Sequence, residues 1–420
     1  MTKPDTLDAL SLWFLGNPIA PRLVGHLQLM AVGKGVSLTY APAWLSNGFA
    51  LSEDLPLTSM EHLPRTKGVA AGAVDDARPD RWGERVIQFM DKPTRLSLME
   101  YLYYAGDDRF GALGVSTSAQ HYLPRRNGPL PRLGDAQVLS EVVAKINANE
   151  RVSSIERQMV AAGGSFGGAK PKALIEIDGR QWVIKFFNGE PIDAPLIEHA
   201  SMTLSAKAGI RIAQTQVVRL AGEHALAVLR YDRFGVERIH CLSAGTALYA
   251  ETVDGQNADL SYPALAQLLR RLGVTAGKLY LEDMHELFRR MVFNILIDNT
   301  DDHEKNHALL VTEPTRNGRL RLAPAYDVLP SNSGQGHQEF GVGLDGSDST
   351  LANAMSQCTL FGLTAKQAGA EVLRVIKVVN GWRAHFKSCG VSSPDIESLA
   401  ERIDGAPLAS QRRDFAALMA

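Results

Sequence analysis

The chemically densest stretch of the sequence is residues 299–307, which read Asn-Thr-Asp-Asp-His-Glu-Lys-Asn-His. Carboxylates, imidazoles, an ammonium group and carboxamides follow one another there. Such groups are rarely buried together unless a metal, a partner or water satisfies them. The stretch therefore predicts either a functional site or an exposed turn, and two kinds of chemistry fit its spacing.

The first kind is zinc chemistry. His303, Glu304 and His307 have the H-E-x-x-H spacing, which on an α-helix places two imidazoles one turn apart for zinc and a glutamate as general base. Such a helix needs apolar residues on both sides. Residues 299–302 instead have the composition of a helix end, and residues 308–311 that of a strand, so the context disfavours a zinc metalloprotease.

The second kind is phosphoryl transfer. Asp301 and Asn306 have the D-x-x-x-x-N spacing of a kinase catalytic loop, in which the aspartate orients the acceptor hydroxyl and the asparagine binds Mg²⁺. The pair alone is common by chance, so its surroundings decide. A helix predicted at residues 285–298 precedes it. A predicted hairpin follows and leads to Tyr326 and Asp327, where a kinase places its second metal-binding aspartate.

Upstream residues supply the other parts of such a site in the expected order. A glycine-rich segment, residues 163–172, lies between a predicted helix and a predicted strand. Lys185 lies on a strand predicted at residues 181–187, and Glu198 lies on a helix predicted at residues 194–208. In kinases a strand lysine contacts the phosphates of ATP and pairs with a glutamate on the next helix.

The elements expected around these residues form a mixed α+β chain. Alternating apolar and polar residues broken by glycines predict a hairpin within residues 19–52, and Asp-Gly and Asn-Gly turns predict two more hairpins. The second half is expected to be helical apart from one hairpin, and the glycine- and serine-rich residues 331–346 to form a loop. Further helices are predicted at 78–90, 96–104 and 137–147, and strands at 173–177, 215–220, 225–231, 307–311 and 320–323.

The 420-residue chain is longer than one ordinary domain, so two to three domains are expected, with residues 124–134 as a linker. A composition of 45% hydrophobic and 21% charged residues excludes collagen-like, mucin-like and wholly disordered proteins. The formal net charge of −2 disfavours a protein whose whole surface binds nucleic acid.

The cysteines and the N-terminus indicate the compartment. Cys241, Cys358 and Cys389 are far apart and form no C-x-x-C motif, so neither a disulfide framework nor a thiolate zinc site is expected. Asp5 and Asp8 precede only a short apolar stretch, and no run approaches 18 apolar residues, which disfavours a signal peptide or a membrane span. We expect a soluble, cytoplasmic protein.

Taken together, these motifs resemble those of the HipA-like serine/threonine kinases, the toxins of bacterial toxin–antitoxin pairs. The resemblance covers nearly the whole chain. It rests on residues 23–25 (LVG), 80–83 (DRWG), 106–113 (GDDRFGAL), 165–172 (SFGGAKPK), 229–233 (LRYDR), 300–306 (TDDHEKN) and 324–327 (PAYD). The resemblance implies an α+β, bilobal, protein-kinase-like fold: a β-rich N-terminal subdomain (1–123), a small lobe with glycine-rich loop and hinge (124–233), and a mostly helical large lobe (234–420).

Carried over residue by residue, the resemblance implies ATP and Mg²⁺ as cofactors. Asp301 would be the catalytic aspartate, with His303 near the γ-phosphate, and Asn306 and Asp327 would hold Mg²⁺. The backbone of two of the implied ATP-binding residues, Leu229 and Tyr231, would form the hinge that meets adenine. The full set of implied ATP-binding residues is Ser165, Phe166, Gly167, Gly168, Ala169, Lys172, Lys185, Glu198, Leu229 and Tyr231.

Ser165 matches the family's autophosphorylation serine. The chain departs from the family pattern at Leu229, where an acidic residue is common, and at Gly163 and Gly164, which make the loop richer in glycine. The resemblance also implies a protein substrate, with an aminoacyl-tRNA synthetase as the suggested target. A small helix-turn-helix antitoxin would be the partner, DNA would be bound only through that antitoxin, and no membrane would be involved.

Two alternatives use the same residues. A small-molecule kinase would share Asp301, Asn306 and Asp327 and differ only in its acceptor. A catalytically silent binding module, acting as a co-repressor with its antitoxin, would not turn over ATP. The intact set of three metal-site and catalytic residues disfavours that second alternative.

Overall fold

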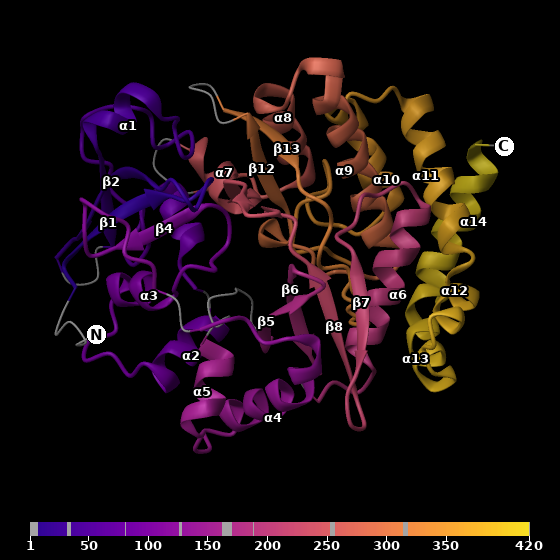
Figure 1. Cartoon of the computed structure of the whole chain (residues 1–420). Coiled ribbons are helices and arrows are strands. Elements are labelled where there is room, and N and C mark those ends of the chain that lie inside the picture. Colours follow the sequence, from indigo (N-terminus) through magenta and orange to yellow (C-terminus); the bar gives the residue numbers. More distant parts are fainter. Residues whose placement is uncertain are drawn as a thin grey trace.

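The structure is a computed structural model that describes residues 7–31, 35–79, 81–125, 128–161, 170–187, 189–252, 257–313 and 318–419. Within these residues, three sheets of three or four strands follow one another along the chain, and the part from residue 351 to residue 419 is mostly helical (Figure 1). A two-stranded ribbon, β9 (Arg233–Phe234) with β10 (Glu237–Arg238), lies between the second and third sheets in the sequence. None of the described helices is long and apolar enough to cross a membrane.

The first sheet has the strand order β3-β2-β1-β4, and all its pairs are antiparallel. The hairpin predicted within residues 19–52 is confirmed as β2 and β3. Helices and 3₁₀ turns pack around this sheet, and most residues of β1, β3 and β4 are accordingly buried, whereas β2 also has exposed positions. The elements are β1 (Ala9–Phe14), β2 (Arg22–Leu29), β3 (Val36–Tyr40), α1 (Pro42–Asn47), η1 (Gly72–Ala77), α2 (Arg81–Met90), α3 (Leu98–Tyr104) and β4 (Leu113–Ser116).

The second sheet has the order β5-β6-β8-β7 and is covered on both faces. Leu226 and Val228 pack toward α6 on one face, while Ala225 and Ala227 pack toward α4 on the other. Because both faces are covered, β8 is apolar at every position after His224. The elements are α4 (Ala136–Asn147), α5 (Ser154–Ala161), β5 (Lys172–Ile177), β6 (Arg180–Phe186), α6 (Ala194–Lys207), β7 (Thr215–Arg219) and β8 (His224–Leu229).

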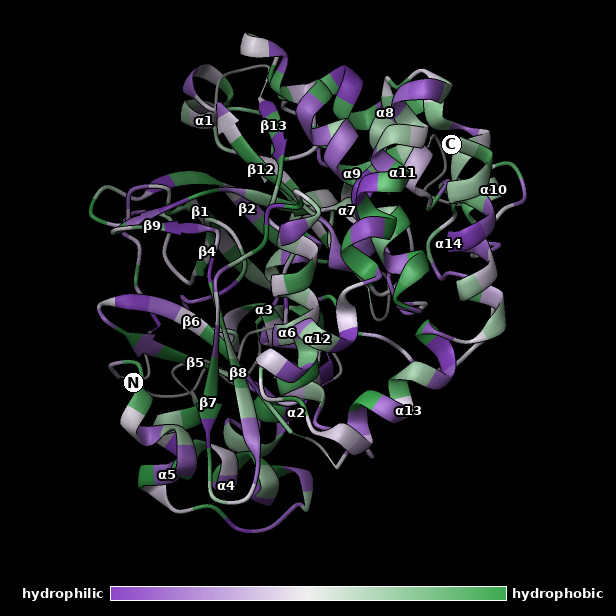
Figure 2. Cartoon of the chain, turned by 90° about the vertical axis from the view of Figure 1, so that its right-hand side faces the viewer, coloured by the Kyte–Doolittle hydropathy of each residue, from purple (hydrophilic) through white to green (hydrophobic). Residues whose placement is uncertain are grey.

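The third sheet, β11-β12-β13, contains the predicted Asn-Gly hairpin and one strand that the sequence pattern missed. β11 (Cys241–Ser243) is too short to show an alternation of apolar and polar residues. Helices of this part carry hydrophobic residues on one side and hydrophilic residues on the other (Figure 2). They are α7 (Ala244–Ala250), α8 (Tyr262–Leu272), α9 (Leu279–Leu296), α10 (Leu351–Ser356), α11 (Ala365–Val379), α12 (Trp382–Ser388), α13 (Ser393–Ile403) and α14 (Ala406–Met419), around β12 (Ala308–Glu313) and β13 (Arg319–Leu322).

The helix predicted from residue 285 begins earlier, at Leu279. Asp283 is the reason that the sequence pattern failed there. This carboxylate is fully buried and forms ion pairs with Arg211 (2.6 Å) and Arg321 (2.7 Å). A charged residue therefore occupies a core-facing position and interrupts the apolar periodicity from which the helix was predicted.

Candidate active site

The loop that carries Asp301 begins directly after α9. Asp298 has a left-handed backbone (φ 57°), which turns the chain away from the helix axis. The N–H groups of Thr300 and Asp301 both donate to the hydroxyl of Ser331, at 2.9 and 3.1 Å. These two hydrogen bonds fix the direction of the main chain at Asp301.

The following turn brings Asn306 back toward Asp301. Its side-chain amide donates to the Asp301 carbonyl at 3.3 Å, and the N–H of Lys305 donates to Nδ1 of His303 at 3.2 Å. This segment is a 3₁₀ turn, η4 (Glu304–Asn306), that leads into β12. The predicted proximity of Asp301, His303 and Asn306 is therefore present in the structure.

The same geometry excludes the zinc interpretation. His303 and His307 lie on a 3₁₀ turn and a strand entry rather than one turn apart on an α-helix. His307 is buried and its Nε2 is 2.8 Å from the Asp302 carboxylate. Among the described residues, no group of three or more His, Cys, Asp or Glu side chains is placed to hold a metal ion.

A buried network of hydrogen-bonded side chains supports the loop that carries Asp301. Asp302 accepts hydrogen bonds from Tyr262 and His307, and Asn294 donates to the Tyr262 hydroxyl at 3.1 Å. The His307 ring stacks on Phe340 with 5.5 Å between ring centres. Burial alone would raise the pKa of Asp302, but its hydrogen-bonded partners outweigh burial and lower it. The sequence interpretation assigned no role to this network.

A second cluster joins β6, α6 and the loop after β13. Lys185 Nζ lies 2.5 Å from Glu198 Oε1 and 3.2 Å from Asp327 Oδ1, and it donates to the Tyr326 carbonyl at 3.2 Å. Glu198 is only 5% exposed, so it is not a solvated residue on the outer face of its helix. Three residues that are separated in sequence and were predicted to act together are therefore in direct contact.

The charges in this cluster depend on one another. Burial disfavours the Lys185 ammonium, but the Asp327 and Glu198 carboxylates outweigh burial and hold its pKa above the ordinary value. Burial raises the pKa of Glu198 despite the nearby ammonium. Burial would also raise the pKa of Asp327, yet Lys185 and Lys172 lower it below the usual range. At neutral pH the cluster therefore presents an ammonium beside an ionised Asp327.

Lys172 lies directly opposite Lys185 on the neighbouring strand, so both side chains leave the same face of the sheet. The Lys172 backbone is held in turn, because the Trp82 indole N–H donates to its carbonyl at 2.7 Å. Both ammonium groups lie close enough to Asp327 to lower the pKa of that carboxyl. Lys172 therefore joins the predicted cluster.

The predicted hinge follows β8. The Leu229 N–H donates to the Gln214 carbonyl at 2.8 Å, so this amide belongs to the sheet. The Tyr231 ring lies 5.2 Å from the Tyr326 ring, centre to centre. The Tyr326 hydroxyl donates to the Lys305 carbonyl, which connects the hinge side of the site to the catalytic loop.

The remaining predicted site residues lie outside the described part of the chain. They belong to the glycine-rich segment and are Ser165, Phe166, Gly167, Gly168 and Ala169. Asp80, the first residue of one of the family motifs, also lies outside it.

The fold and these two clusters are kinase-like: a strand lysine is paired with a helix glutamate, and Asp301 and Asn306 share one loop, which we call the catalytic loop after its counterpart in kinases. The family model of the HipA N-terminal domain matches residues 19–116, and that of the HipA-like C-terminal domain matches residues 164–382, which is more than half of the chain. The chain belongs to the HipA family.

Relatives and solved structures agree with this assignment. Y4mE of Sinorhizobium fredii, named as an inferred kinase, is 24% identical over 93% of this chain and 87% of its own. Y4dM of the same organism is also named as an inferred kinase. It is 28% identical to this chain over a region that covers 57% of this chain and 59% of Y4dM. HipA of Shewanella oneidensis, solved with HipB and operator DNA, has the same fold, with a TM-score of 0.65 and 16% identity over 97% of both chains.

Proposed function

We propose that this protein is an ATP- and Mg²⁺-dependent serine/threonine protein kinase of the HipA-like toxin type. The observation that carries the proposal is the Lys185 ammonium, held 2.5 Å from Glu198 and 3.2 Å from Asp327. In kinases this pairing orients a lysine toward the ATP phosphates and places a metal-binding carboxylate beside it. In the proposed bilobal arrangement, ATP lies between the second sheet and the catalytic loop.

The side chains at the catalytic loop fit the proposed metal. Asn306 and Asp327 line one small cavity, and their carboxamide and carboxylate oxygens are the hard donors that Mg²⁺ prefers. When bound, Mg²⁺ neutralises negative charge on the phosphates. Asp327 is ionised at neutral pH because neighbouring lysines lower its pKa, so its charge is available to a cation.

Asp301 orients the acceptor hydroxyl in this proposal. Partial burial raises the pKa of Asp301, and the Asp327 carboxylate raises it further, whereas His303 opposes them. A raised pKa makes a carboxylate a better proton acceptor while it remains ionised near neutral pH. His303, within the same turn, adds a polar group beside the transferred phosphate.

The acceptor and the partners belong to the same proposal. We propose a serine or threonine on a protein, with an aminoacyl-tRNA synthetase as the candidate target and Ser165 as the acceptor in self-phosphorylation. The HipA of Shewanella oneidensis was solved with HipB and operator DNA. We therefore propose a HipB-like helix-turn-helix antitoxin as partner, through which DNA is bound.

The proposal is tested by incubating the full-length protein with labelled Mg-ATP and cell lysate and identifying the phosphorylated proteins. Asp301→Asn should abolish transfer, because the carboxylate orients the acceptor, and should leave the Kd for Mg-ATP nearly unchanged. Asp178→Asn, the same change at an exposed turn of the second sheet, is the matched control and should keep full activity.

Retention of more than a few per cent of transfer by Asp301→Asn would contradict the catalytic assignment. Transfer to small alcohols but to no protein would favour the small-molecule kinase. Peptide mass spectrometry of the same samples tests Ser165: phosphate on that residue is expected in the active protein and not in Asp301→Asn. An unmodified Ser165 in active protein would contradict self-phosphorylation and leave the kinase proposal standing.

A further inference from the structure

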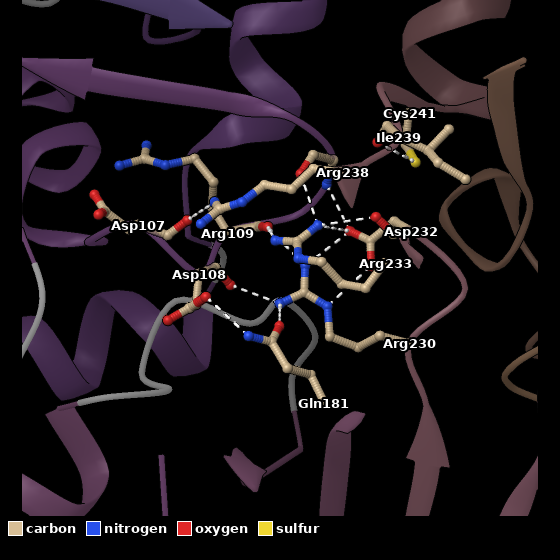
Figure 3. A network of polar contacts seen from close by, with 11 residues as sticks. Asp107, Asp108, Arg109, Gln181, Arg230, Asp232, Arg233, Arg238, Ile239 and Cys241 are labelled. Atoms are coloured by element: carbon tan, nitrogen blue, oxygen red, sulfur yellow. Dashed lines mark hydrogen bonds and ion pairs between the residues drawn. The ribbon is translucent and has the colours of Figure 1, made fainter. Parts of the chain in front are cut away.

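The end of β8 and the residues that follow it contact a loop that lies more than a hundred residues earlier in the sequence. We call residues 229–233 the hinge segment and residues 106–111 the N-terminal loop. Figure 3 shows side chains from these two segments directed toward one another in one connected network of hydrogen bonds and ion pairs. The N-terminal loop follows α3 and precedes β4, so it belongs to the region of the first sheet.

Charged side chains of the hinge segment bind the backbone of the N-terminal loop. Arg230 donates to the Arg109 carbonyl at 2.9 Å and forms an ion pair with Asp232 at 2.8 Å. Asp232 in turn accepts from the Gly111 N–H at 2.8 Å. Arg233 donates to the carbonyls of Arg109 and Gly111, both at 2.9 Å. The hinge segment is therefore bound on both sides of its central residue.

The interlocked charges are buried. Arg230 is 4% exposed and Asp232 3%. Gly111 has φ 73°, a conformation that favours glycine, and a Cβ there would lie 3.1 Å from the Cys241 amide nitrogen. Gly111 is thus fixed by its own conformation and by the closeness of β11, and neither segment is able to move relative to the other without breaking buried hydrogen bonds.

Aromatic contacts connect the N-terminal loop to the candidate active site. The Phe110 ring of the N-terminal loop lies edge-on to the Tyr231 ring, 6.5 Å between centres, and Tyr231 lies against Tyr326 at 5.2 Å. The Tyr326 carbonyl accepts from Lys185, and its hydroxyl donates to the Lys305 carbonyl. Three rings therefore connect the region of the first sheet to the strand lysine and to the catalytic loop.

From this geometry we propose that the N-terminal loop positions the hinge segment for adenine, with Phe110 acting through Tyr231 as a positioning residue. The proposal rests on the proposed kinase function, which places adenine against the hinge segment. Adenine is distinguished from guanine by hydrogen bonds to the edge of the base, so displacement of the hinge backbone by a fraction of an ångström weakens that discrimination. The region of the first sheet is then part of the nucleotide site.

The experiment measures the Kd of the full-length protein for Mg-ATP and Mg-GTP by calorimetry. Phe110→Leu removes the ring and keeps an apolar side chain. It should lower the ATP-over-GTP preference about five-fold, the effect of weakening one hydrogen bond. Phe110→Tyr keeps the ring and should retain the wild-type preference. The matched control is Phe234→Leu, three residues from Tyr231 but 78% exposed, which should change nothing.

Each result separates this proposal from the function on which it rests. Equal weakening of ATP and GTP binding by Phe110→Leu would mean a general structural role and would overturn the proposal, as would an unchanged preference. Either result leaves the kinase function standing. Wild-type protein that binds ATP without preferring it to GTP would also overturn the proposal. Wild-type protein that binds neither nucleotide would overturn the proposed function and this inference with it.

Discussion

The hinge segment and the catalytic loop are each supported by buried polar side chains, but the two supports are built from different groups. At the hinge segment, Asp232 is paired with two full cations, Arg230 at 2.8 Å and Arg233 at 3.0 Å. Below the catalytic loop, Asp302 instead accepts from an imidazole and a phenol. The first support joins residues more than a hundred positions apart, and the second lies within one region of the chain.

This difference predicts different losses of stability when the central carboxylate of each support is removed. Burial would raise the pKa of Asp232, but Arg230 and Arg233 overcome it and lower the pKa to about 2. Removal of that carboxylate would leave two guanidinium groups buried without their partner, which is costly because desolvation is no longer offset. At the catalytic loop, removal of the carboxylate leaves groups that need only a hydrogen-bond acceptor.

The largest expected effect follows from that contrast. Asp232→Ala should destabilise the protein by about 3–5 kcal/mol, because it removes one partner of a buried ion pair and leaves the other charge buried. Urea denaturation followed by circular dichroism measures the loss. The control is Asp414→Ala, which removes an aspartate paired with Arg413 where both side chains are exposed, and it should leave the denaturation midpoint unchanged. A small effect of Asp232→Ala would remove the distinction between the two supports.

The second prediction concerns pH and the region beside the hinge segment. His240 is buried between the first and third sheets, donates from Nε2 to the Leu51 carbonyl at 2.9 Å and lies 5.7 Å from the Phe49 ring. Burial lowers the pKa of His240 to about 4, although its hydrogen bond to Leu51 opposes the shift. The unfolded chain, with a histidine pKa near 6.5, therefore binds this proton before the folded protein does.

Because unfolding takes up a proton, stability is fully present above about pH 6.5 and is lost as the pH falls toward 4, by up to about 3 kcal/mol. Denaturation midpoints of wild type and His240→Asn between pH 4 and 7.5 measure this contribution, which should be missing from the variant. His121→Asn, at an exposed position, should keep the wild-type profile. Parallel profiles for wild type and His240→Asn would contradict the assignment.

The sequence predicted the parts of the site that depend on short spacing. Asp301 and Asn306 are five positions apart, and Asp327 follows a hairpin with a clear turn, so their proximity follows from local structure. The contact between Lys185 and Glu198 was also predicted correctly, from the kinase pattern of a strand lysine and a glutamate on the next helix. Such consecutive elements usually pack against each other, so this contact needs no long-range information.

The sequence did not predict the contacts that join distant segments. The N-terminal loop was identified only as part of a family motif, and nothing in its composition indicated that Arg230 would bind it. The role of Tyr262 was missed because its partner Asp302 is forty positions away. Long-range pairs of this kind leave no periodicity in one sequence, although an Asp or Arg in an otherwise buried segment is the signal that could have indicated them.

The smallest expected effect comes from Asp302→Asn. Asparagine keeps the shape of the side chain and one acceptor oxygen, so the protein should lose about 1–2 kcal/mol of stability, less than Asp232→Ala. The catalytic loop would be held less firmly, and the rate of phosphoryl transfer should fall several-fold while the ATP-over-GTP preference stays at the wild-type value. Urea denaturation, a transfer assay and the two Kd measurements test these expectations together.

Since Asp302 supports the loop and not the hinge segment, a change in nucleotide preference would show that the two supports are coupled. Combination with Phe110→Leu sharpens the result, because independent supports should give additive changes in the free energy of unfolding.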